Sequence, residues 1–197
     1  MLFKRKNKKF TKVLKSSKSE SHTKNWDETM INILSDIERH SKCSAKKVAC
    51  LIVNESNMGY NILSIGVNGT PSGYINCCDK WKRLGDGWFD REKMKVCNDK
   101  NAHYEWSIKN EIHAEMNALA KCNQNNISAQ NSIAFISYSP CANCSKMLVA
   151  FGVKRVVFVN KYDDFDSSVK EFLLNNNVEL KQLYKDINGE FVHKNIK

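Results

Sequence analysis

Two kinds of hydrophobic spacing divide the chain into predicted helices and strands. Apolar residues first recur at helical spacing over residues 26–40, which predicts a helix. The apolar residues of this helix are Trp26, Met30, Ile33, Leu34 and Ile37. Two short apolar segments follow, "KVACLIVN" and "NILSIGVN", and the polar sequence "ESNMGY" separates them. They predict two β-strands joined by a turn.

The second half of the chain alternates between the two patterns. Helical spacing over residues 112–123, 141–151 and 166–175 alternates with strand-like runs in "SIAFISY", "RVVFVN" and, more briefly, "VELKQL". This order predicts an α/β fold with a mixed central β-sheet flanked by helices. Residues from about 70 to 105 show little periodicity, and we interpret them as a long insertion.

Length and charge narrow the class of protein. The chain has 197 residues, 42% of them hydrophobic, which suits one core and predicts a single domain over residues 26–197. Residues 1–25 hold nine of the 31 Lys and Arg but one of the 21 acidic residues, so we expect a disordered basic arm. The remainder is nearly neutral, which argues against a nucleic-acid partner.

No segment approaches the roughly 18 consecutive apolar residues that a membrane span requires. A cytoplasmic protein without a membrane partner is therefore expected, in the cytoplasm of the host cell if the source is viral. Eight cysteines in a chain without a secretory signal predict metal ligands and reduced thiols more readily than disulfides.

The sequence "SPCANC" follows a predicted strand. Ser139 is a suitable N-cap and Pro140 suits the first helical position, so Cys141 and Cys144 are predicted in the opening turn of a helix, on the same side. A helix N-terminus lowers the pKa of a thiol and favours the thiolate that binds metal. Two cysteines supply half of a tetrahedral zinc site, and a third ligand with an open fourth position would make the site catalytic.

His113 is the leading third ligand because it also begins a predicted helix. Glu115, two residues later, could move protons at the open position without binding the metal. The pattern H-x-E followed by P-C-x-x-C is the known signature of zinc-dependent base deaminases. The alternative is a zinc-stabilised binding module without turnover, but such a module needs no carboxylate beside an open position.

Longer segments carry a resemblance to a known family. These segments are "SKCSAKKVACLIV", "GVNGTPSGYINCCD", "AHYEWSIKNEIHAEMNAL", "SPCANCSKMLVAFGVKRVVF" and "NKYDD". Together they resemble the cytidine deaminase superfamily, and within it the deoxycytidylate (dCMP) deaminases of T-even-like bacteriophages. The resemblance implies a three-layer fold and zinc-dependent hydrolysis of dCMP to dUMP and ammonia, which supplies dUMP for thymidylate synthesis.

The resemblance also implies roles for individual residues. His113, Cys141 and Cys144 would hold zinc and Glu115 would be the proton shuttle. The implied substrate contacts are Asn68 at the sugar, Ala114, and Tyr162 against the base. From the residues alone, Asn68 also suits a left-handed turn residue and Tyr162 a strand-end aromatic.

A second metal would tie down the insertion. Cys77 and His103 bracket its central part, and a metal joining them would close the loop, with Cys43 and Glu111 completing a tetrahedral set. Spacing alone leaves open that these are ordinary core or surface residues. The phage-type enzymes carry a second, structural zinc, so the resemblance implies these four ligands. The substitute ligands would be Cys78 and Cys97.

The resemblance further implies a homohexamer that dCTP, with Mg²⁺, activates and dTTP inhibits. Lys109 and Lys161 are candidates for holding the substrate phosphate, although exposed lysines are usually only solvated. One enzymatic alternative remains, because "SYSPCANC" also resembles the RNA- and DNA-editing cytidine deaminases and the basic arm would suit a polynucleotide.

Overall fold

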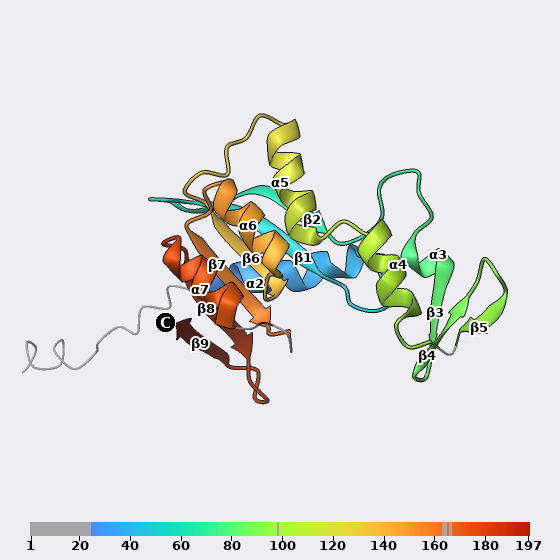
Figure 1. Cartoon of the computed structure of the whole chain (residues 1–197). Coiled ribbons are helices and arrows are strands. Elements are labelled where there is room, and N and C mark those ends of the chain that lie inside the picture. Colours follow the sequence, from blue (N-terminus) through green and yellow to red (C-terminus); the bar gives the residue numbers. More distant parts are fainter. Residues whose placement is uncertain (1–24, 98, 163–164, 166) are drawn as a thin grey trace, which may run out of the picture.

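The computed structural model describes residues 25–97, 99–162, 165 and 167–197. The predicted arm, except Asn25, and Asp166 of the helix predicted over residues 166–175 lie outside these residues. The elements follow in chain order (Figure 1): α2 (Trp26–Ile37), η1 (Glu38–His40), β1 (Ala49–Ser56), β2 (Gly59–Val67), α3 (Cys77–Lys80), β3 (Trp81–Leu84), β4 (Gly87–Asp90), β5 (Lys95–Cys97), α4 (Ala102–Asn110), α5 (Ala114–Gln124), β6 (Ile133–Tyr138), α6 (Ala142–Ala150), β7 (Arg155–Asn160), α7 (Ser167–Asn175), β8 (Glu179–Lys185) and β9 (Phe191–Ile196).

A six-stranded sheet organises the fold, with strand order β2-β1-β6-β7-β8-β9. The strands β6, β7 and β8 are parallel, while the β1–β2, β1–β6 and β8–β9 pairs are antiparallel. The prediction of a mixed central sheet is thus confirmed. The sequence pattern missed β9, an edge strand whose residues are only partly buried or exposed and therefore lack a clear apolar alternation.

Alternate residues of the central strands face two separate cores. In β1, Cys50 and Ile52 pack with α5, α6 and α7, whereas Leu51 and Val53 pack with α2. In Figure 1 the three helices lie on one side of the sheet and α2 on the other. This arrangement is the predicted three-layer α/β fold. Within the described residues, no helix is long and apolar enough to cross a membrane.

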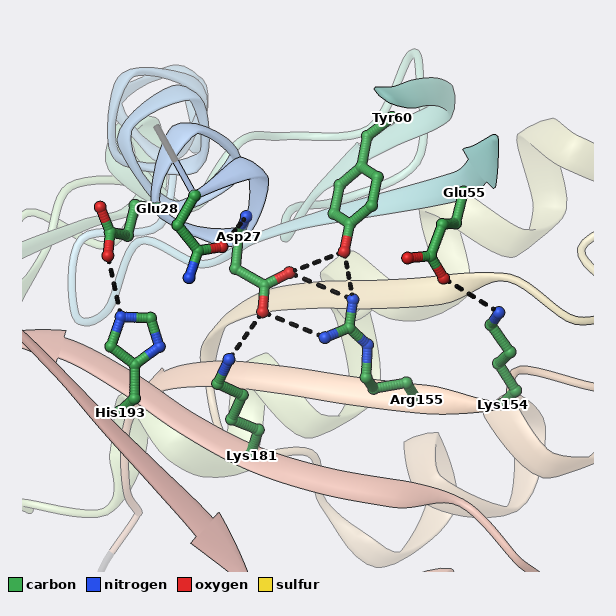
Figure 2. A network of polar contacts seen from close by, with 9 residues as sticks. Asp27, Glu28, Glu55, Tyr60, Lys154, Arg155, Lys181 and His193 are labelled. Atoms are coloured by element: carbon green, nitrogen blue, oxygen red, sulfur yellow. Dashed lines mark hydrogen bonds and ion pairs between the residues drawn. The ribbon is translucent and has the colours of Figure 1, made fainter. Parts of the chain in front are cut away.

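A buried ion network fastens α2 to the sheet (Figure 2). Asp27, only 3% exposed, lies in the first turn of α2, where a negative charge also favours the helix dipole. Arg155 of β7 donates to both carboxylate oxygens at 3.0 and 3.1 Å, Lys181 of β8 donates at 2.8 Å, and the Tyr60 hydroxyl donates at 3.0 Å. Burial alone would raise the pKa of Asp27, but the hydrogen bond from Lys181 and the two positive charges outweigh it and lower that pKa.

The insertion is more regular than the sequence predicted. Its residues form α3, a three-stranded antiparallel sheet of β3, β4 and β5, and α4, which together make a lobe beside the main sheet (Figure 1). The strands are three or four residues long, too short for hydrophobic periodicity to reveal them. A small core of its own packs Trp81 and Trp88 with Cys43 and Cys77.

Candidate active site and metal centres

The first candidate site forms where two helices begin. His113 is the N-cap of α5 and Cys141 is the N-cap of α6, both with extended backbone. The predicted N-cap at Ser139 is wrong by two residues: the Cys141 sulfur accepts the Cys144 N–H at 3.4 Å and so caps the helix itself. The Ser139 hydroxyl instead accepts a hydrogen bond from the Tyr162 N–H at 3.0 Å.

The structure brings the three predicted ligand atoms together. His113 Nδ1 lies 3.6 Å from Cys141 Sγ and 3.4 Å from Cys144 Sγ. Zinc bonds of about 2.3 Å to sulfur and about 2.0 Å to nitrogen, at a tetrahedral angle, place the two donor atoms about 3.5 Å apart. The residues therefore fit a zinc ion with three protein ligands and one open position.

Glu115 lies in the first turn of α5, beside this cluster, and is 4% exposed. In a continuous helix, residues two positions apart point in nearly opposite directions. His113 has extended backbone and precedes the helix, so this rule does not separate its side chain from that of Glu115. Burial raises the pKa of the Glu115 carboxyl, whereas the charge of His113 opposes that rise. A buried carboxylic acid with a raised pKa is suited to exchanging protons near neutral pH.

The environment of the two thiols shifts their pKa values in opposite directions. Hydrogen bonds from Cys144 and His113, against the effect of burial, lower the pKa of Cys141 to about 4. The interaction with Cys141, followed by burial, raises the pKa of Cys144. The bond to Cys141 also raises the pKa of His113. A divalent cation would take over the role of these protons.

A second group of donor atoms lies at the base of the lobe and contains the four predicted residues Cys43, Cys77, His103 and Glu111, whose ligand atoms all lie within 4.8 Å of one another. Cys77 Sγ lies 3.0 Å from His103 Nε2 and 4.0 Å from Cys43 Sγ, and Cys43 Sγ lies 3.5 Å from Glu111 Oε2. Tetrahedral zinc would place two sulfurs about 3.8 Å apart. This donor set fits a closed, four-ligand site.

The surroundings of the second cluster support that reading. The Trp88 ring stacks on His103 with ring centroids 4.2 Å apart. The Glu111 Oε1 atom is buried and has no hydrogen-bond partner among the described residues, which is costly unless a cation satisfies it. A hydrogen bond from Cys77, helped by His103, lowers the pKa of Cys43 to about 3 despite its burial. The substitute ligands Cys78 and Cys97 are not members of this group.

Residues 110–113 connect the two clusters. Glu111 joins the second cluster and not the first, as predicted, but residues 111–113 are not helical, so the predicted helix start at residue 112 is wrong. Instead Ile112 forms a two-hydrogen-bond bridge with Gly69, and α5 begins at Ala114.

The model of the cytidine and deoxycytidylate deaminase zinc-binding region matches residues 24–160, which contain both clusters. The chain belongs to this deaminase family. The deoxycytidylate deaminase of Enterobacteria phage T4 is 30% identical over 173 residues, covering 77% of this chain and 86% of that protein. The human deoxycytidylate deaminase is 28% identical over 152 residues, covering 77% of this chain and 74% of that protein.

A solved deaminase structure shares the fold. The dCMP deaminase of cyanophage S-TIM5, crystallised in complex with dCMP and dUMP, superposes with a TM-score of 0.58. It is 29% identical and the match covers 79% of this chain and 94% of that chain. The family resemblance and the predicted cytidine-deaminase-like fold are thus confirmed.

The three residues expected to contact the substrate, Asn68, Ala114 and Tyr162, differ in how many contacts they make with the rest of the protein. The Asn68 amide is heavily used by the protein: its Oδ1 accepts from Ser41 Oγ at 2.6 Å and Val48 N at 2.8 Å, and its Nδ2 donates to the Lys46 carbonyl at 3.0 Å. The alternative of a left-handed turn residue is wrong, because the φ angle of Asn68 is not positive. Its most evident role is to hold residues 41–48 in place.

Ala114 is fully buried at the first position of α5, between His113 and Glu115. The ring of Tyr162 lies 4.8 Å from that of Tyr138, an aromatic partner that the sequence analysis missed. Burial, followed by the charges of Glu115 and other neighbours, raises the pKa of Tyr162. Lys109 and Lys161 are exposed.

Proposed function

We infer that the protein is a hydrolase that converts dCMP to dUMP and ammonia. The observation that carries this inference is the group formed by His113, Cys141 and Cys144, whose spacing suits tetrahedral zinc, with the buried carboxyl of Glu115 beside it. Relatives named deoxycytidylate deaminase, and a solved relative that binds dCMP and dUMP, support this choice of substrate.

Zinc bound by these three residues would supply Lewis-acid chemistry, lowering the pKa of a water in the pocket to about 7. Glu115 would take a proton from the attacking water and deliver it to ring nitrogen 3 of cytosine. The water oxygen bonds to carbon 4 in this step. Glu115 would then take the remaining proton of that oxygen and pass it to the amine, so that the carbon–nitrogen bond breaks, the carbon 4 carbonyl forms and ammonia leaves. The raised pKa of the buried Glu115 suits a group that must both accept and donate a proton.

The test measures dUMP and ammonia produced from dCMP by the zinc-loaded protein. The variant Glu115→Gln should keep its zinc, because Glu115 is not among the clustered ligands, while kcat falls by at least about 100-fold. Full activity in this variant would refute the role of Glu115. Single-stranded DNA is assayed in parallel, and deamination of DNA but not of dCMP would favour a polynucleotide deaminase instead.

The second cluster is proposed to hold a structural zinc. Its four protein ligands leave no open position, and a zinc ion bound there would cross-link residues 43, 77, 103 and 111. The unsatisfied Glu111 oxygen supports the proposal. Two zinc ions per chain are therefore expected.

Effector binding is proposed at a cavity of about 620 Å³ next to the start of the insertion. Its lining includes residues 67–74 and the basic side chains His40, Lys42 and Lys121, which suit a triphosphate. We propose that dCTP with Mg²⁺ activates and dTTP inhibits from this cavity, that the active form is a homohexamer, and that the dUMP product feeds a thymidylate-forming methylation. Kinetics with each nucleotide and the molar mass in solution test these points.

A further inference from the structure

A lysine outside the predicted set of site residues lies over the aromatic pair Tyr138 and Tyr162. The Lys46 ammonium group is 4.3 Å from the centroid of the Tyr162 ring and 5.3 Å from that of the Tyr138 ring. Such a cation is attracted to the ring faces. The Tyr162 N–H donates to the Ser139 hydroxyl at 3.0 Å, and Ser139 lies two residues before Cys141, so the ammonium group lies at the margin of the candidate active site.

The backbone around Lys46 is fixed, although its side chain is exposed. The Lys46 carbonyl accepts a hydrogen bond from Asn68 Nδ2 at 3.0 Å, and the Val48 N–H donates to Asn68 Oδ1 at 2.8 Å. Asn68 therefore fixes the backbone at Lys46 and again at Val48. The fixed backbone and the contact with the two tyrosine rings together define the position of the Lys46 ammonium group.

The charge of Lys46 has no acidic partner within ion-pair distance among the described residues. Other basic residues near the sheet are already engaged: Arg155 and Lys181 bind Asp27. Contact with an aromatic ring is a weak interaction, and a phosphate dianion attracts an ammonium group more strongly. Lys46 is thus poised to exchange the ring for an anionic ligand.

Resting on the proposed function, we propose that Lys46 binds the 5′-phosphate of the substrate and makes the enzyme select a nucleotide over a nucleoside. The cytosine base enters beside Glu115 and Tyr162, and the phosphate, at the other end of the same small molecule, reaches the ammonium group at the margin. This role goes to Lys46 and not to Lys109 or Lys161, for which the structure shows no contact with the Tyr138–Tyr162 pair.

The experiment compares the wild type with Lys46→Gln, Lys46→Arg and Lys47→Gln. Lys47 is the matched control, because it is an exposed neighbour whose ammonium group donates to the Arg39 carbonyl. Lys46→Gln should raise KM for dCMP by about 10- to 100-fold, the worth of a hydrogen bond to a charged group, with kcat nearly unchanged. Lys46→Arg should recover most of this loss, and Lys47→Gln should behave as wild type.

Competition separates phosphate binding from a packing role. Deoxycytidine, which lacks the phosphate, should inhibit wild type and Lys46→Gln equally, whereas inorganic phosphate should inhibit the variant less. An unchanged KM, or an equal loss of deoxycytidine and dCMP binding, would overturn the assignment. A wild type that leaves dCMP intact refutes the proposed function instead, and calorimetric dCMP binding to wild type and variant then still decides the role of Lys46.

Discussion

Gly66 allows α5 to lie unusually close to the sheet, and adding one methyl group there should misplace the catalytic residues. A Cβ atom at Gly66 would lie 2.1 Å from the Ala114 carbonyl oxygen, 2.5 Å from the Ala118 nitrogen and 3.0 Å from the Ala118 Cβ. All three contacts are to the first two turns of α5. Since two of them are backbone atoms, no side chain can rotate away to relieve the clash.

The size of the displacement follows from these distances. A carbon atom and a carbonyl oxygen approach no closer than about 3.3 Å, so α5 must move from β2 by roughly 1 Å in Gly66→Ala. Overpacking of this kind costs about 1–3 kcal/mol of stability. A shift of about 1 Å in catalytic groups can lower the rate about 100-fold, and the atom struck, the Ala114 carbonyl, lies between His113 and Glu115.

The assay measures kcat for ammonia release, the melting temperature and the zinc content of Gly66→Ala. Ala120→Ser is the matched control, because it also adds one heavy atom but on the exposed side of the same helix. We expect a large loss of kcat in Gly66→Ala with the protein still folded, and little change in the control. Wild-type kcat and melting temperature in Gly66→Ala would refute the argument from close packing.

Two further variants test the ion network and the second cluster. Asp27→Asn leaves Arg155 and Lys181 without their carboxylate, so the free energy of unfolding at pH 7 should fall by about 3–5 kcal/mol in denaturant titrations. The pKa of Asp27 is lowered in the folded state, so the ionised carboxylate stabilises the fold fully above the unfolded pKa of about 3.9. This stabilisation is lost as the pH falls through the folded-state pKa. The unfolding free energies of wild type and Asp27→Asn should therefore converge in acid. Glu111→Ala should lower the zinc content by about one ion per chain, whereas the exposed control Glu105→Ala should not; equal zinc in both variants would contradict the structural site.

The regular part of the fold follows from the sequence because its strands and helices are long enough to show a period. The strand predicted from "SIAFISY" is β6, whose residues Ile133 to Ile136 are fully buried. The lobe could not be predicted in the same way. Its strands pair over three or four residues, and a set of ligands and indole rings from distant positions holds it together.

The candidate site was predictable where chemistry requires particular residue types at fixed spacing. The sequences around His113 and Cys141 carry that information, and the seven predicted metal ligands and the proton shuttle fall into one site and one further cluster. The close approach at Gly66 and the position of Lys46 were not predictable. Both depend on which residues face one another after folding, and neither residue type signals its partner.

The second cluster is linked through the backbone to His113 of the first cluster, so it can influence catalysis. Only Ile112 separates Glu111 of the second cluster from His113 of the first, and Ile112 is pinned by backbone hydrogen bonds of 2.8 and 3.1 Å to Gly69. Asn68, the neighbour of Gly69, holds the segment that carries Cys43 and Lys46. A cation in the second cluster would therefore fix, through short rigid connections, both the imidazole at the reaction centre and the ammonium group at its margin. Its loss should weaken catalysis although none of its ligands touches the substrate.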